Sequence, residues 1–271
     1  MSFLEFEFMQ RALVAAVLVG AAAPAIGTFL VQRRLSLMGD GIGHIALTGV
    51  ALGFLLGTAP VLTAIAVSIA GAIAIELIRA RGRTSGDVAL ALLFYGGIAG
   101  GVLLIGLSPS GSSTTLIGYL FGSLSSVRPG DLIVIAGLSV AVIGVVIVFG
   151  RELFAVSMDE EVARVSGLPV QFLNILVAVT AAVTVSVAMR VVGLLLVSAL
   201  MVVPVATSQQ LARSFRTTLS GACIVGVVAS VGGLVVAYYG DVAPGAATVV
   251  LAIGSFLLAA SVAQVRRRIA T

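Results

Sequence analysis

The sequence predicts an all-α membrane protein, a polytopic bundle of about nine transmembrane helices. Its mean hydropathy is +1.23, and 60% of the 271 residues are hydrophobic while only 10% are charged. Apolar blocks of about 20 residues, the length that crosses a bilayer as a helix, recur along the chain. The blocks lack the alternation of barrel strands, so helices that satisfy their own backbone hydrogen bonds are expected. Residues 1–271 are expected to form a single transmembrane domain.

Hydropathy places the spans in order along the chain. The first follows Glu5 and Glu7, whose charge is wrong for the start of a cleaved signal peptide, so this span is expected to be retained. Residues 110–127, after the fourth span, have polar ends and a short apolar middle, which suits a re-entrant or interfacial segment better than a crossing. The nine predicted spans are residues 11–32, 37–57, 59–79, 86–107, 129–149, 170–190, 192–212, 217–239 and 243–264.

Arginine supplies all the positive side-chain charge, with 15 Arg and no Lys. Cytoplasmic loops of membrane proteins are enriched in basic residues, and most arginines fall at every second turn, which places the C-terminus inside and the N-terminus outside. Without lysine the chain has no P-loop, so any ATP hydrolysis by the usual route takes place on another chain. The net charge of +4 comes from short loops, so no nucleic-acid partner is expected. The arginines assigned to the inside are Arg33, Arg34, Arg79, Arg81, Arg83, Arg151, Arg164, Arg213, Arg216 and Arg266–Arg268.

A polar interruption at residues 151–169 separates the fifth span from the sixth. Within it, residues 158–165 are expected to form a short helix with an acidic first turn and a basic last turn, both favourable for the helix dipole. A glycine then provides a C-cap. The segment is either an ordinary solvated loop or, because valines give it an apolar side, a cytoplasmic docking helix for a partner. The residues concerned are Asp159, Glu160, Glu161, Arg164 and Gly167.

Asp40 and His44, the only histidine, stand four residues apart at the start of an apolar run. Side chains at this spacing share a helix face, with Cβ atoms about 5–6 Å apart, so the two could hold one cation. Oxygen and imidazole ligands suit divalent zinc or manganese, and an ionisable residue at membrane depth suggests function. The alternative is that Asp40 caps its helix while His44 is hydrogen-bonded in the bundle. Gly39 and Gly43 form a small-residue spacing that lets membrane helices approach closely.

Three stretches together form a recognisable pattern. GTFLVQRRLSLMGDGIGHIALTGVALG occupies residues 27–53, GLLLVSALMVVPVATSQQLAR with Pro204 occupies 193–213, and MDEEVARVSGLPV lies between them. In content, order and spacing they resemble the metal-ion permease subunits of ABC importers, the zinc and manganese uptake family. The likeness covers essentially the whole chain. Two departures are Gly43 and Thr48, which stand where other residues are frequent in the family.

The resemblance implies a passive, lipid-embedded permease of the cell membrane that is not itself an enzyme and holds no permanent cofactor. Asp40 and His44 match the family's intramembrane pair and would line the path of a divalent metal. Zinc is the first choice because the pair includes an imidazole, but manganese and ferrous iron accept the same ligands. Residues 158–167 would dock into an ATP-binding subunit, and the kinking Pro204 keeps its place. The other implied partners are a second permease copy, forming a homodimer, and an extracytoplasmic metal-binding protein.

A proton-coupled secondary metal transporter is the alternative function, because it too would place Asp and His in the membrane. It would not need a docking element at residues 151–169, so stimulation of a partner's ATP hydrolysis separates the two. A metalloenzyme is disfavoured, since the chain has no HExxH motif and only one histidine. Importers of large organic cargo, such as siderophores or cobalamin, would need no Asp/His pair.

Overall fold

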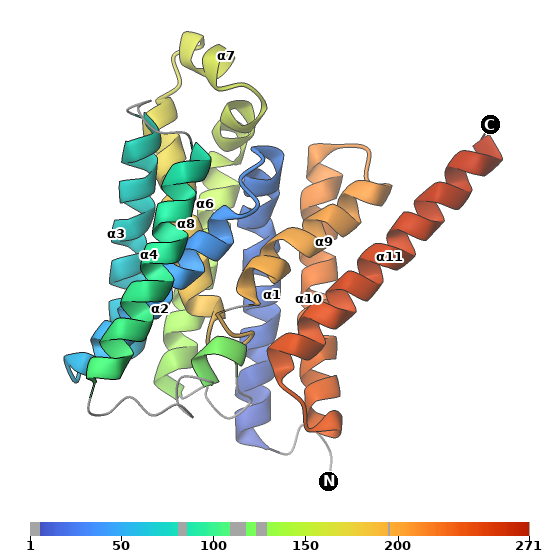
Figure 1. Ribbon diagram of the computed structural model, residues 1–271. Coiled ribbons are helices and arrows are strands. Elements are labelled where there is room, and N and C mark those ends of the chain that lie inside the picture. The colour runs from blue at the N-terminus through green and yellow to red at the C-terminus, as the bar shows by residue number, and fades with distance from the viewer. Residues whose placement is uncertain (1–5, 81–85, 109–117, 123–128, 195, 271) are drawn as a thin grey trace.

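The computed structural model describes residues 6–80, 86–108, 118–122, 129–194 and 196–270. These residues are helical apart from connecting turns, and none of them forms a strand, which confirms the predicted all-α class. The chain passes repeatedly between the two ends of an elongated bundle (Figure 1). The helices are α1 (Glu7–Gln32), α2 (Met38–Leu55), α3 (Pro60–Ala80), α4 (Gly86–Leu107), α6 (Pro129–Met158), α7 (Glu160–Val165), α8 (Val170–Ala188), α9 (Val197–Leu211), α10 (Phe215–Gly240) and α11 (Pro244–Ala270).

Eight of these helices are long and apolar enough to cross a membrane, which makes the chain a multi-pass membrane protein. They correspond to eight of the nine predicted spans. The remaining predicted span, the seventh in order at 192–212, is too long, because α9 has 15 residues and begins only at Val197. Residues 189–194 form a largely buried turn, in which Gly193 has a φ of +89°. Hydropathy alone does not distinguish an apolar helix from an apolar buried turn, and for this reason the predicted span is too long.

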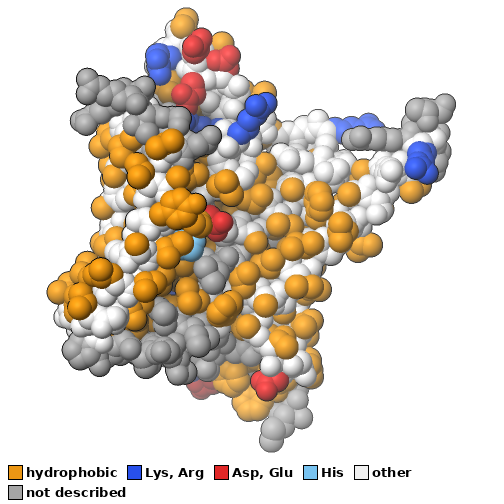
Figure 2. Space-filling view, in the orientation of Figure 1, with side chains coloured by type: hydrophobic (Ala, Val, Ile, Leu, Met, Phe, Trp, Pro, Cys, Tyr) orange, Lys and Arg blue, Asp and Glu red, His pale blue; other side chains and the backbone are white. Residues whose placement is uncertain are grey.

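The two ends of the bundle differ in charge. α7 and the C-terminus lie at one end, here called the α7 end, and the N-terminus lies at the other (Figure 1). Basic side chains gather at the α7 end (Figure 2), which agrees with the arginine pattern in the sequence. Most of the predicted re-entrant segment at residues 110–127 lies outside the described residues, as do Arg81, Arg83 and Arg128.

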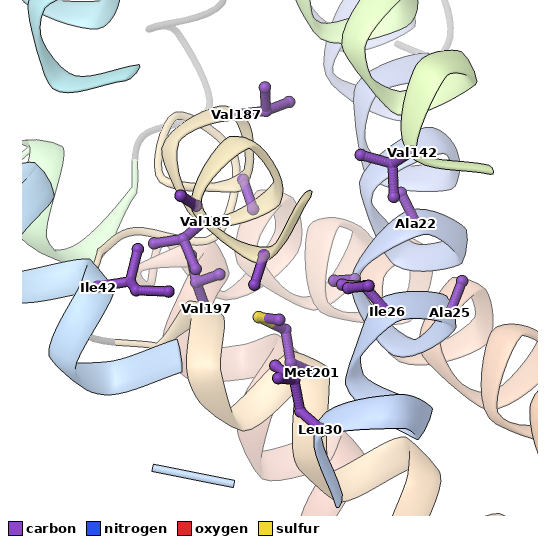
Figure 3. Packing of buried hydrophobic residues seen from close by; sticks show 14 of the residues in the cluster. Ala22, Ala25, Ile26, Leu30, Ile42, Val142, Val185, Val187, Val197 and Met201 are labelled. Carbon is purple, nitrogen blue, oxygen red and sulfur yellow. The ribbon is translucent and has the colours of Figure 1, made fainter. Parts of the chain in front are cut away.

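Small residues bring the central helices into close contact. α1 packs against α6, α8, α9 and α10, while α2 packs on α3 and α4. A Cβ added to Gly226 of α10 would lie 2.2 Å from the carbonyl oxygen of Gly20 in α1, so only glycine fits there. Ile26 of α1, Ile42 of α2 and Met201 of α9 point into one shared apolar space (Figure 3). The short helix α9 is thus held against both α1 and α2, which places its side chains beside the start of α2.

Candidate functional site

Asp40 lies in the first turn of α2 but does not cap the helix. The N-cap position is Leu37, which makes no side-chain capping hydrogen bond. The Asp40 carboxylate instead accepts a hydrogen bond from the Ser198 hydroxyl of α9, with 2.6 Å between the oxygens. Hydrogen bonds to an ionised carboxylate are short and about twice as strong as neutral ones. The acid is therefore held by a neighbouring helix, in disagreement with the capping alternative.

His44 lies one helical turn further along α2 and is 9% exposed. Its Nδ1 atom is buried and has no hydrogen-bond partner among the described residues. The ring packs edge-on against Phe94 of α4, with 4.3 Å between ring centroids. A buried nitrogen left unsatisfied costs about 1–3 kcal/mol, so such an atom needs a functional explanation. A cation that takes up the Nδ1 lone pair would provide one.

A cavity of about 350 Å³ adjoins Asp40, between the start of α2 and one face of α4. The only histidine (pale blue) reaches the surface midway between the two ends of the molecule (Figure 2). α4 packs closely on α2 at His44, because a Cβ on Gly97 of α4 would lie 2.6 Å from the His44 carbonyl carbon. The residues that line the cavity are Leu37, Asp40, Leu90, Ala91, Phe94 and Tyr95.

Beyond His44, away from the α7 end, α2 is covered by an apolar cluster. Leu194 belongs to this cluster and is 3% exposed, and its amide donates to the Tyr119 carbonyl over 2.9 Å. The turn at residues 189–194 therefore pairs with the described piece at 118–122. Arg190 lies 4.9 Å from the centre of the Tyr119 ring and 3.6 Å from the Asp131 carboxylate. The buried members of the cluster are Ala46, Leu47, Val50, Ala64, Met189 and Leu194.

The segment at residues 151–169 is a helix end, a break and a short helix. α6 continues through Met158, so the interruption is shorter than predicted. Asp159 is the N-cap of α7, and its side chain accepts from the amides of Glu161 and Val162 at 2.9 and 3.0 Å. The predicted helix over 158–165 therefore begins two residues too early, since a capping aspartate stops the helix from extending backwards.

The end of α7 is closed by a Schellman motif. Gly167 has a φ of +83°, the amide of Leu168 donates to the Ala163 carbonyl and that of Gly167 donates to the Arg164 carbonyl, each over 3.1 Å. This is the pattern in which a left-handed residue after the helix satisfies its last carbonyls. Gly167 is therefore the left-handed residue that ends α7, as the sequence predicts, and it directly follows the C-cap residue Ser166, so that α7 is fixed at both ends.

A family model described as the ABC 3 transport family matches residues 5–263 of the chain. The chain belongs to this family. It is 33% identical over 263 residues to the manganese import system permease protein ScaB of Streptococcus gordonii, covering 97% of this chain and 94% of that one. It is 28% identical over 253 residues to the high-affinity zinc uptake system membrane protein ZnuB of Haemophilus influenzae, covering 93% and 97%.

A solved structure supports the same assignment to the ABC 3 transport family. PsaBC from Streptococcus pneumoniae, in complex with Fab, is 35% identical to this chain and superimposes with a TM-score of 0.85, covering 94% of this chain and 91% of that one. The similarity therefore extends over nearly the whole bundle. The family resemblance carried by the three sequence stretches is confirmed.

Within this ABC 3 family member, the residues predicted for metal binding and those predicted for coupling lie in two different places. Asp40 and His44 share α2, whereas Asp159, Glu160, Arg164 and Gly167 lie in or around α7. Gly39 and Gly43 have room for a Cβ, whose nearest neighbours would be 3.4 and 3.5 Å away, so the closest approaches are at other glycines. Pro204 is buried inside α9. Thr48 donates to the Gly97 carbonyl over 2.8 Å, which explains this departure from the family pattern as a helix contact.

Sequence reasoning missed Ser198, the residue that holds Asp40. Ser198 is 158 positions away along the chain, and nothing in its own neighbourhood distinguishes it from other serines in apolar runs. Its membership in the second family-like stretch was the only available signal. Phe94, the aromatic neighbour of His44, was missed for the same reason, since its role depends on how α4 packs on α2.

Proposed function

We propose that this chain is the membrane-spanning subunit of an importer for a divalent transition metal, and that Asp40 and His44 form a transient site for that ion. One observation carries the proposal: a buried, unpartnered imidazole nitrogen lies one turn from a carboxylate that is held beside a cavity. Membership in the ABC 3 transport family supports the transport role. The ion is cargo, so a site that binds it briefly and releases it is required.

The chemistry of the pair suits such a cargo. The carboxylate supplies negative charge against the dication, and the imidazole supplies a nitrogen that hard ions such as magnesium do not favour. Ser198 orients the Asp40 carboxylate, which reduces the motion lost on binding. Asp40 and His44 supply two ligands from one helix, and water fills the remaining coordination positions of the ion. The affinity is therefore moderate and the ion can be released.

Manganese and zinc are the two cargoes proposed. The relative named for manganese import is 33% identical to this chain, and the one named for zinc uptake is 28% identical. These names favour manganese, whereas the imidazole and the general affinity order favour zinc. The preference for zinc stays a prediction that competitive uptake of the two metals tests.

ATP hydrolysis is proposed to occur on a separate subunit that docks on α7. The chain has no lysine and so no P-loop. α7 projects beyond the bundle (Figure 1) and presents two exposed valines, Val162 at 62% and Val165 at 90% exposure. Exposed apolar side chains on a capped helix suit the groove of a partner protein. A second copy of the permease and an extracytoplasmic metal-binding protein complete the proposed assembly.

Uptake into proteoliposomes tests this function. The permease, its co-expressed ATPase and the binding protein are reconstituted, and radiolabelled manganese and zinc are supplied separately with and without ATP. Asp40→Asn should nearly abolish uptake of both metals. Asp241→Asn is the matched control, because Asp241 has a φ of +48°, which Asn tolerates. Uptake driven by a proton gradient without ATP would instead support the secondary transporter.

A further inference from the structure

Arg33 is a buried charge at the junction of α1 and α2. Its side chain is 6% exposed and forms an ion pair with Glu160, the first residue of α7. Burial lowers the pKa of Arg33 below its ordinary value, and the carboxylates of Glu160 and Glu76 oppose this effect. A guanidinium in such a place requires a carboxylate, because an uncompensated buried charge strongly destabilises the fold. The position of Arg33 is therefore tied to that of Glu160.

The same Glu160 oxygen also reaches a third helix. Glu160 Oε1 accepts from the Asn174 amide of α8 over 3.1 Å, in addition to the Arg33 guanidinium. One atom of α7 thus connects the end of α1 with the first half of α8. Asn174 is 9% exposed, and its own oxygen has no partner among the described residues. Through Glu160, α7 therefore has polar contacts with two helices of the bundle, whereas Val162 and Val165 are exposed.

The Arg33 position is coupled directly to the start of α2. Only residues 33–37 separate α1 from α2, and they form a compact turn in which Leu35 donates to the Leu30 carbonyl over 2.8 Å and Met38 donates to the Leu35 carbonyl over 2.9 Å. Arg34 adopts a left-handed conformation, with a φ of +59°. Because this connection is short and hydrogen-bonded, a displacement of Arg33 also moves the first turn of α2, which carries Asp40.

Space next to the ion pair permits such a displacement. A cavity of about 250 Å³ lies beside Glu160, and its wall includes Glu76, Arg79 and Asn174. Glu76 of α3 is 4% exposed and forms its own ion pair with Arg79 over 2.9 Å. A second carboxylate is thus close enough to act on Arg33 when Glu160 moves. The arrangement offers Arg33 two acidic neighbours on two different helices.

We propose that the Arg33–Glu160 ion pair is the link that transmits movement of α7 to Asp40, with both residues acting as positioning residues for transport. The inference rests on the proposed function, in which an ATP-hydrolysing subunit docks on α7. Binding of ATP to that subunit displaces α7, Glu160 carries Arg33 with it, and the turn at residues 33–37 moves Asp40 relative to Ser198. The metal site then opens or closes in step with the ATPase.

The test measures how ATP changes the accessibility of Leu37, which is 67% exposed and lines the cavity at Asp40. Leu37→Cys is introduced in a Cys223→Ala background, and its maleimide labelling rate is followed in the complete complex with and without ATP and vanadate. In the parent complex the rate should change on ATP trapping. With Glu160→Gln the ATPase subunit should still co-purify, but the ATP effect on labelling should be lost, as should ATP-driven uptake. The fall in ATP-driven uptake relative to the parent complex should be about 5–150-fold, the range typical of coupling between two sites.

Glu7→Gln is the matched control, because it also removes one carboxylate charge from an ion pair, that of Glu7 with Arg11, but Glu7 is 84% exposed in the first turn of α1, away from α7. It should leave labelling and uptake unchanged. The exchanged pair Arg33→Glu with Glu160→Arg should restore part of both signals, and Arg33→Gln provides a second disruption if Glu160→Gln is poorly expressed. Normal ATP-dependent labelling and uptake in both Glu160→Gln and Arg33→Gln would overturn the link while leaving the transport function intact. If Asp40→Asn also transports normally, the proposed function itself has failed.

Discussion

At the residue scale, the Asp40 carboxylate and the His44 imidazole have different surroundings. Asp40 is held by the Ser198 hydroxyl at 2.6 Å, whereas His44 Nδ1 has no partner among the described residues. A transient ion site requires a carboxylate that is already oriented, as at Asp40, and a nitrogen whose lone pair is available, as at His44. The sequence predicted the pair from its spacing, and the structure adds the hydroxyl that orients the acid.

His44→Ala should reduce transport and change metal preference. Removal of the nitrogen donor should weaken zinc more than manganese, because the affinity of nitrogen-containing sites is higher for zinc. Competitive uptake of the two metals in proteoliposomes measures the shift. Because both side chains serve one binding step, the Asp40→Asn, His44→Ala double variant should be little worse than the worse single one. Independent, additive losses would argue against a shared site.

Ser198→Ala should weaken metal uptake without abolishing it. The variant removes a hydrogen bond to a charged group, which contributes about 1.5–3 kcal/mol, so the metal concentration at half-maximal uptake should rise by roughly tenfold or more. Ser186→Ala is the control, since Ser186 is buried in α8 and its hydroxyl has no partner among the described residues. Equal behaviour of the two variants would remove Ser198 from the site.

At the element scale, α7 owes its fixed position to its two caps. A six-residue helix is not stable on its own, and here Asp159 satisfies its first amides while Gly167 closes its last turn. The ion pair from Glu160 then attaches it to α1. The caps leave Val162 and Val165 exposed at the tip, where a partner can reach them.

Gly167→Val should uncouple ATP hydrolysis from transport. A β-branched residue with a positive φ costs about 1–2 kcal/mol, so the Schellman motif should open and α7 should lose its position. Uptake and stimulation of the ATPase should fall together, while the permease still inserts and folds. Gly167→Asn, which tolerates the left-handed conformation, should be much closer to the parent. Undiminished transport by the valine variant would show that the segment is only a connector.

Gly226→Val should destabilise the bundle itself. The added side chain would meet the Gly20 carbonyl oxygen at 2.2 Å from its Cβ, and α1 and α10 would have to separate. Overpacking of this kind typically costs about 1–3 kcal/mol. Thermal unfolding of the detergent-solubilised protein, followed by size-exclusion chromatography, should show a lower midpoint. Gly254→Val in α11 is the comparison, because nothing lies within 4 Å of a Cβ there, and a similar drop in that variant would refute the packing argument.

At the scale of the whole molecule, charge and topology agree. The chain passes from an N-terminus at one end to a C-terminus at the α7 end (Figure 1), and the basic side chains collect at the α7 end (Figure 2). Positive residues are retained on the cytoplasmic side of membranes. The α7 end is therefore expected to face the cytoplasm, where ATP is available.

Cysteine labelling tests this orientation. In a Cys223→Ala background, a cysteine at Val165, which is 90% exposed at the α7 end, should react with an impermeant maleimide only after the cells are opened. A cysteine at Tyr239, which is 73% exposed near the opposite end of α10, should react in intact cells. The reverse pattern would invert the topology and place α7 outside, which would also exclude its role as the ATPase docking site.

Local patterns in the sequence were sufficient for several features of this protein. Continuous apolar runs determined the helical membrane class and most spans, because bilayer crossing depends on the composition of about 20 adjacent residues. The spacing of Asp40 and His44 placed them on one helix face, since helical periodicity is a local property. The position of Gly167 after a short charged helix predicted its C-cap, which depends on backbone conformation at one residue.

Tertiary structure alone decided which distant residues meet. Ser198 reaches Asp40 across 158 positions, and Arg33 reaches Glu160 across 127. Both contacts depend on how the helices pack, and in a membrane that packing is governed by the fit of small side chains between helices that are all apolar. Hydropathy does not contain this information. For the same reason the sequence overextended the seventh span, because only the packing of residues 189–194 against 118–122 explains why that apolar run turns before α9 begins.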